Sequence, residues 1–458
     1  MRSRRRSQAM RGRERGVALL MVLAAVSLLY VLAEQTREDV EVYSLAATVA
    51  RDQLIAEHEA RSGVNLARMV LHAEPAIRRA ITPILTPLMA LMGRGLQPPP
   101  QLPVWEQADL FLGPFIGHGG GALLGELAHV DLESGRNLGG LTGLSPIVIV
   151  DEDSKININS AVRSSLAQIL LGRQFQGLVL NPELDPFFER PDPDGALTDR
   201  YTLFSNIIDY VDFDETLFDA QSLLASSARA SGAGSEDPFY QRLRTPYRRR
   251  NAPLDSLEEL RMVRGLGDDA LWQRIIDPDP GNPRRRVVTV WGQGAVNVNS
   301  ANAQTLLALI CAYSTQSPAC IDPTQMSRFI TSITLVQAMT LSMGIPLFTN
   351  GQSFVATAQG RPPLGPMLTA MGLQPFNIND PSALERSATT ESKVFSVYSE
   401  AQVGNAHVRI HAVIDTRPQP QLPSTFLRAS GVQVTQSADG TMNITPTRGG
   451  TIIHWRED

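Results

Sequence analysis

The residues with the clearest chemical potential are acidic, and they gather near the middle of the chain. The group comprises Asp209, Asp212, Asp214 and Glu215, followed by Glu236 and Asp237. A hard cation such as Ca²⁺ takes about six to eight oxygen ligands, often from closely spaced carboxylates and backbone carbonyls. The pattern predicts a structural calcium site at Asp209, Asp212, Asp214, Glu236 and Asp237. A solvated acidic face, on which water screens the repulsion between these charges, is the alternative that the sequence leaves open.

Two cysteines, Cys311 and Cys320, form the second chemical feature. They are too few for a disulfide scaffold, and their spacing does not suit a four-ligand zinc site. A single bridge is open to them in an oxidising compartment, because a loop containing proline separates them. The alternative is that both cysteines are buried as free thiols.

Enzymatic chemistry finds no support in the motifs. The chain has no Gly-x-Ser-x-Gly, phosphate-binding loop or dinucleotide fingerprint. His407 and His411 fall in a predicted strand, where about 13 Å separates positions four apart, so they cannot share a metal as they would on a helix. We therefore predict a protein that is not an enzyme.

Charge is distributed unevenly along the 458 residues. The net charge is −5, yet the first sixteen residues carry seven arginines and one glutamate. The remainder is clearly acidic, which argues against non-specific binding to nucleic acid.

The amino terminus combines this basic segment, residues 1–16, with the apolar run Val17–Ala33. A cleaved secretory signal and an uncut signal anchor both fit the order of basic and apolar residues. A third possibility is a prepilin-type leader that is cut between Gly16 and Val17, before the apolar run. That run would then stay in the membrane, where its seventeen residues span about 25 Å as a helix.

A helical pattern continues beyond the apolar run. Apolar residues recur among charged ones up to Gly63, without proline or glycine. We predict one spine helix over residues 17–72, with its first part in lipid and its amphipathic second part packed on a globular body. Residues 73–154 are rich in proline and glycine and predict a loop-rich first part of that body, with strands at Leu123–Leu132 and Pro146–Val150.

A short repeat marks the internal organisation. KININSA at residues 155–161 returns as AVNVNSA at residues 295–301, and a leucine-rich stretch follows each copy. Each copy predicts a short strand that turns into a helix, with Asn or Ser as the helix cap. Between them, residues 155–295 predict a mainly helical inserted domain of helix-hairpin-helix or SAM-like type, with a capping box at Ser256 and Glu259.

Arg261–Asp268 resembles the hairpin of a helix-hairpin-helix module, and its part Val263–Gly267 supports an alternative function, a membrane-anchored nucleic-acid receptor. Its backbone amides would hold phosphate, and nearby arginines would supply charge: Arg248, Arg249, Arg250, Arg261 and Arg264. The acidic body stands against this reading.

Residues 296–458 predict the remaining part of the globular body. A helix and a Gly/Pro-rich insertion at residues 344–381 precede alternating strands at Lys393–Ala401, His407–Ile414 and Thr451–Trp455. The chain is therefore predicted to be α+β, with a transmembrane spine helix, a pilin-like antiparallel sheet and a large helical insertion.

Seven motifs in series resemble the K class of type II secretion pseudopilins, general secretion pathway protein K. They are GVALL (16–20), KININSA (155–161), SNIIDYVDFDE (205–215), GSEDPFY (234–240), PLDSLEELRMVRGLG (253–267), VVTVWG (287–292) and VNVNSA (296–301). The resemblance spans most of the chain, and the long loops near residues 74–143, 220–234 and 311–385 depart from it.

This resemblance implies a minor pseudopilin at the tip of the secretion pseudopilus, anchored in the bacterial inner membrane with its body in the periplasm. It implies prepilin peptidase, the inner-membrane assembly platform and the minor pseudopilins of the I and J classes as partners, methylation of the Val17 amine, and calcium in the helical domain. Met21 occupies the fifth mature position, where most pilins have glutamate. The K class also lacks that carboxylate, which suits a subunit with none above it.

Overall fold

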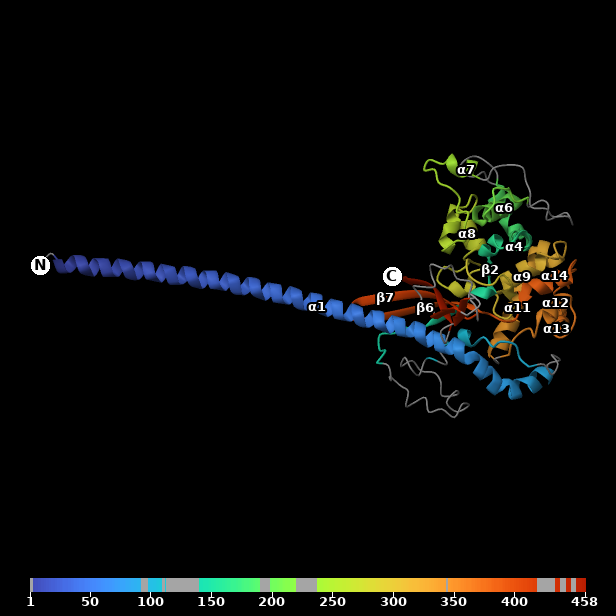
Figure 1. Ribbon diagram of the computed structural model, residues 1–458, viewed down its shortest axis with the longest axis horizontal. Coiled ribbons are helices and arrows are strands. Elements are labelled where there is room, and N and C mark those ends of the chain that lie inside the picture. The colour runs from blue at the N-terminus through green and yellow to red at the C-terminus, as the bar shows by residue number, and fades with distance from the viewer. Residues whose placement is uncertain are drawn as a thin grey trace.

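A computed structural model describes residues 3–91, 98–108, 112, 140–189, 198–219, 237–342, 345–417, 433–436, 442–445 and 450–458. The chain is α+β, as predicted. A very long N-terminal helix projects from a body that contains an antiparallel sheet and two groups of helices (Figure 1).

Helix α1, Ser3–Leu91, extends well beyond the predicted end at residue 72. Pro75, Pro83 and Pro87 lie inside it. Proline removes a backbone hydrogen bond and bends a helix, and the last turns of α1 curve around the body in Figure 1. The helix continues because its last turns are packed: Leu85 and Met89 are buried in the core beneath the sheet.

One four-stranded sheet forms the centre of the body. Its strands are β1 (Val148–Asp151), β6 (Val394–Val403), β7 (Ala406–Asp415) and β10 (Thr451–Glu457), all antiparallel in the order β1-β6-β7-β10. These strands agree with four predicted ones, whereas the predicted strand at Leu123–Leu132 lies outside the described residues. A separate hairpin joins β8 (Gln433–Gln436) and β9 (Met442–Thr445).

The second part of α1 packs on one face of this sheet. Ala56, Ala60 and Ala67 are fully buried and share a core with the inward side chains of β6 and β7. The close approach needs small residues: a Cβ on Gly63 would lie 2.1 Å from Ser399 Oγ. Short η1, Val104–Gln107, adds Trp105, whose ring centroid lies 4.9 Å from that of Phe395.

The helices from η2 to α14 lie between β1 and β6 in the sequence, and they form two lobes with separate cores. We call residues 152–291 the first lobe and residues 295–389 the second lobe. The first lobe contains η2 (Glu152–Ser154), β2 (Ile156–Asn157), η3 (Ile158–Val162), α4 (Ser165–Val179), η4 (Pro182–Leu184), α5 (Asp185–Phe188), α6 (Arg200–Val211), α7 (Pro238–Gln241), η6 (Leu257–Met262), α8 (Asp269–Ile275), η7 (Pro283–Arg285) and β3 (Val288–Thr289).

The second lobe differs from the predicted organisation. It contains β4 (Val296–Asn297), α9 (Ala303–Cys311), α10 (Pro318–Ile321), α11 (Pro323–Ser342), α12 (Gly351–Ala358), α13 (Gly365–Ala370), α14 (Pro381–Ser387) and β5 (Ala388–Thr389). Sequence composition assigned residues 296–389 to the sheet-bearing body, with a Gly/Pro-rich insertion at residues 344–381. Prolines at the first turns of α13 and α14 start helices instead of interrupting them.

The repeated Asn-containing motifs open the two lobes in the same way. In each lobe the opening strand pairs in parallel with that lobe's own closing strand, β2 with β3 and β4 with β5. Asn159 of the first copy exchanges two hydrogen bonds with the backbone of Leu254, and Asn299 of the second copy does the same with Phe348. Asn157 caps η3 directly after the first short strand, as predicted, whereas the longer helices α4 and α9 are capped further along, by Ser164 and Asn302.

Candidate cation site and membrane helix

The acidic residues of the predicted calcium site meet at the C-terminal end of α6. Asp209 lies in its last turn, Asp212 is its C-cap, and Asp214 follows in the next loop. Asp237 precedes α7 and approaches the same place through Arg249. Glu236, the fifth predicted ligand, lies outside the described residues.

Arg249 occupies the centre of this acidic cluster, with a side chain that is only 2% exposed. Its Nη1 donates to the backbone oxygen of Asp209 at 2.8 Å, and its Nη2 donates to that of Asp214 at 2.9 Å. Its Nε lies 3.3 Å from Asp237 Oδ1, and Nη1 lies 3.7 Å from Asp212 Oδ1. The sequence suggested Arg249 as a phosphate-binding residue and gave no sign of this role, because 40 residues separate Arg249 from Asp209.

Burial shifts the acids of this cluster strongly. It raises the pKa of Asp209 to about 8, against the lowering effect of the amide N–H of Phe218, which donates to its carboxylate. Burial also raises the pKa of Asp212 to about 7, with Asp214 adding to the shift and Arg249 opposing it. Both carboxyl groups are therefore costly to ionise here, and a nearby cation would lower that cost.

One buried carboxylate oxygen in the cluster accepts no hydrogen bond. Gln168 donates to Asp212 Oδ2 at 3.1 Å, while the buried Asp212 Oδ1 accepts no hydrogen bond. Backbone and carboxylate oxygens near it are of the kind that Ca²⁺ prefers. Within the described residues, however, no three His, Cys, Asp or Glu side chains are arranged to hold a metal ion. The oxygen donors are of the chemical type that binds calcium, and Arg249 supplies positive charge at the centre of the cluster.

Four of the five arginines of the alternative nucleic-acid reading, Arg249 included, make contacts within the protein. Arg250 forms ion pairs with Asp255 and Glu259. Arg261 pairs with Asp269 and lies over the ring of Trp272, 4.4 Å from its centroid, and Arg264 lies over Phe239 at the same distance. The hairpin glycine Gly265 has a φ of 91°, and a Cβ there would lie 2.9 Å from a methyl carbon of Leu203. The hairpin thus packs on α6, and the predicted capping box of Ser256 and Glu259 is present.

Cys311 and Cys320 form a disulfide in the second lobe, with a Cα–Cα distance of 5.6 Å. The bridge ties the end of α9 to the short helix α10, and both cysteines are buried. His407 and His411 lie on β7, as expected; His411 stacks on Tyr398, with ring centroids 4.4 Å apart.

The proposed processing site lies within α1. Gly16 and Val17 are both inside this helix, and Val17 begins a stretch long and apolar enough to cross a membrane, by length and composition. None of that stretch is buried in the body, and Met21, Leu28 and Tyr30 are each more than 60% exposed. Figure 1 shows this part of α1 far from the rest of the chain.

Comparisons with known proteins give one family. Residues 154–275 match the model of the first domain of type II secretion system protein K. Among solved structures, one similar chain is from "The Crystal Structure of the GspK-GspI-GspJ complex from enterotoxigenic Escherichia coli Type 2 Secretion System"; it is 15% identical with a TM-score of 0.38, over 69% of this chain and 82% of that one. No curated protein matches the chain. The match covers most of the first lobe, so that lobe is similar to the corresponding part of type II secretion system protein K.

Proposed function

We propose that this protein is a non-enzymatic minor pseudopilin at the tip of the type II secretion pseudopilus. The family match supports the secretion system, and the observation that carries the role in a fibre is the exposed apolar surface of α1. A prepilin peptidase would cut after Gly16 and leave Val17 as the first residue, with methylation of its amine. The cut protein would stay in the inner membrane with its sheet and lobes in the periplasm.

The part of α1 beyond the apolar run supports the proposal of neighbouring subunits. Val40, Tyr43 and Leu45 are each more than 60% exposed, although they lie among charged residues and beyond the length that a bilayer covers. Neighbouring spine helices would bury this surface. We propose the minor pseudopilins of the I and J classes as these neighbours, and the inner-membrane assembly platform as the site where they join the fibre.

Processing at Gly16 gives the first test of this function. We expect Gly16→Glu to leave the full-length precursor in membranes, because a charged side chain would occupy the position next to the cut bond. Mass spectrometry of the amino terminus measures this directly. Gly12→Glu adds the same charge to the leader four residues earlier and should still give a chain that starts at Val17. A start near Glu34, or an uncut wild-type chain, would return the segment to an ordinary signal peptide or signal anchor.

We also propose that the acidic cluster binds calcium as a structural ion. Asp209, Asp212 and Asp214, with Asp237 and Glu236, would hold it, and the ion would offset the cost of ionising the buried carboxyl groups. Asp212 Oδ1, buried and without a hydrogen-bond partner, is the observation that supports this proposal.

Chelation tests the calcium proposal in the intact protein. With calcium at about a hundred times its Kd, we expect a melting temperature on the order of 5 °C higher than in chelator. Asp212→Asn should abolish this difference. Asp269→Asn, which changes an acid paired with Arg261 outside the cluster, should keep it. An identical melting temperature for the wild type with and without chelator would show that the cluster does not bind calcium as a structural ion.

A further inference from the structure

A cavity of about 430 Å³ lies between the two helical lobes, a common location for ligand sites. Its walls come from α4, η4 and α8 of the first lobe and from α9 and α11 of the second. The lobes approach closely beside it, because a Cβ on Gly177 would lie 2.0 Å from the backbone oxygen of Ala308. This contact of α4 with α9 holds the two walls at a fixed separation.

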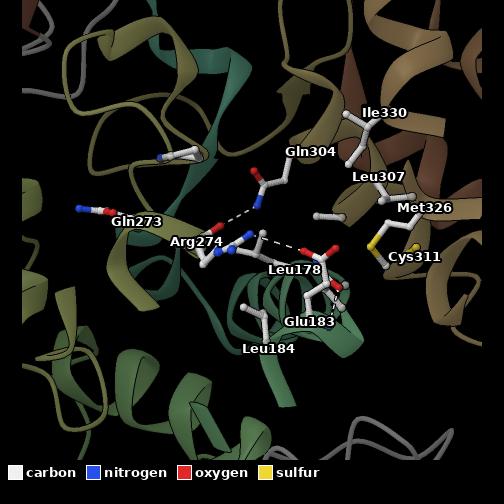
Figure 2. Close-up of a pocket in the computed structure, with 14 residues that line it drawn as sticks. Leu178, Glu183, Leu184, Gln273, Arg274, Gln304, Leu307, Cys311, Met326 and Ile330 are labelled. Atoms are coloured by element: carbon white, nitrogen blue, oxygen red, sulfur yellow. Dashed lines mark hydrogen bonds and ion pairs between the residues drawn. The ribbon is translucent and has the colours of Figure 1, made fainter. Parts of the chain in front are cut away.

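One side of the cavity is apolar. Figure 2 shows Leu178, Leu307, Met326 and Ile330 around the opening, with the sulfur of Cys311 beside Met326. Leu178 belongs to the core of the first lobe, and Leu307 and Met326 belong to that of the second. The disulfide therefore fixes part of the wall, and an apolar group placed here would be shielded from water by both cores.

The opposite side is polar but carries no net charge. Arg274 and Glu183 form an ion pair at 3.5 Å across the rim, and their side chains are 63% and 56% exposed (Figure 2). An exposed pair of this kind contributes little to stability and yields easily to a ligand. Because the two charges offset each other, the rim favours neither an anion nor a cation.

Carboxamides supply the remaining polar groups of the rim. Gln304 uses its Nε2 to donate to the backbone oxygen of Arg274 at 2.8 Å, which leaves its Oε1 as an acceptor. Asn181 uses its Oδ1 to accept from the amide of Glu183 at 2.9 Å, which leaves its Nδ2 as a donor. The exposed Gln273 offers one more carboxamide. An acceptor and a donor beside an apolar floor match a peptide group next to an apolar side chain.

We propose that this inter-lobe cavity binds an apolar side chain presented on a polypeptide backbone. The side chain lies against Leu178, Leu307 and Ile330, and the flanking peptide groups meet the carboxamides of Asn181 and Gln304. The partner is thus a polypeptide segment with an apolar anchor residue and no required charge. This site is independent of the processing of α1 and of the calcium cluster.

The probe for this proposal is N-acetyl-phenylalaninamide, which carries one apolar side chain between two amide groups. Its few heavy atoms limit the expected Kd to about 0.1–1 mM for the full-length protein in nanodiscs. In methyl NMR spectra, we expect the probe to shift the signals of Met326 and Ile330 and to leave that of Leu335 unchanged. Shifts confined to other regions would overturn the proposal without any variant.

Two tryptophan variants on α11 separate the cavity from general hydrophobic binding. Ile330→Trp fills the cavity from its partly exposed edge and should weaken probe binding at least tenfold. Leu335→Trp adds the same side chain at a position that is 52% exposed and does not line the cavity, so it should bind the probe like the wild type. Equal affinities for the two variants would overturn the proposal.

A second probe tests the class of ligand. N-acetyl-phenylalanine differs from the first probe only in ending with a carboxylate, which has no counterpart inside a polypeptide chain. We expect it to bind several-fold more weakly, because the Arg274 charge is already offset by Glu183. Tighter binding of the carboxylate would identify a site for small anionic ligands instead of polypeptide.

Discussion

Replacing Lys155 with methionine is expected to lower the free energy of unfolding by about 3–5 kcal/mol, the usual effect of leaving one partner of a buried ion pair alone. The Lys155 side chain is 2% exposed, and its Nζ lies 3.0 Å from Glu152 Oε1. Burial lowers the pKa of Lys155, and Glu152 opposes that effect. The pKa of Glu152 lies below its usual value. Burial acts to raise it, but the charge of Lys155 and the hydrogen bond from Thr289 outweigh burial.

The position of this pair explains why its loss matters. Glu152 lies where the chain leaves β1 for the first lobe, and it accepts a hydrogen bond from Thr289 of β3, where the chain leaves that lobe. An uncompensated Glu152 would therefore weaken the junction that holds the two ends of the first lobe together.

Urea unfolding of the full-length protein measures this effect. Lys393→Met is the matched control, because Lys393 pairs with Glu391 on the surface, where an ion pair contributes at most about 1 kcal/mol. The double variant Glu152→Met, Lys155→Met should recover much of the loss, since it leaves no buried charge. Equal stabilities for Lys155→Met and Lys393→Met would contradict the interpretation.

Replacing Arg249 with methionine is expected to destabilise the first lobe by a similar amount, about 3–5 kcal/mol in the presence of chelator at pH 8.5. The variant loses the hydrogen bonds to the backbone oxygens of Asp209 and Asp214 and leaves buried carboxylates without their cation. Arg248→Met changes the exposed neighbouring arginine and should alter stability by less than about 0.5 kcal/mol.

The pH dependence of the Arg249 variant has a definite sign. The folded pKa values of Asp209 and Asp212, about 8 and about 7, lie above their ordinary values. The folded state therefore binds more protons than the unfolded state, and these groups add stability as pH falls through 8 and 7. Without Arg249 both pKa values rise further, so the deficit of the variant should shrink by at least about 1 kcal/mol between pH 8.5 and pH 5.5. A deficit that grows on acidification would show that the carboxyl groups are not the cause.

Local sequence signals predicted most of the secondary structure of the sheet-bearing body. Alternation of apolar and polar residues located β6, β7 and β10, because one face of each strand must be buried. Such signals did not predict the end of α1 or the helices of the second lobe. Prolines mark both regions, and proline is compatible with a helix when it lies in the first turn or when packing offsets the lost hydrogen bond.

Some features of the candidate site could likewise be predicted from the sequence, and others could not. The carboxylates near Asp209 were visible because they are neighbours in the sequence, and the apolar run after Gly16 was visible because membrane insertion depends on composition. Only the tertiary structure showed that Arg249 enters the acidic cluster, that Cys311 and Cys320 are joined, and that Leu178 and Ile330 line one cavity. Local composition thus located the apolar run, the strands and the acidic cluster, because each depends on residues close together in the sequence. Contacts between distant segments decided the charge balance of that cluster, within the first lobe, and the cavity, where the two lobes meet.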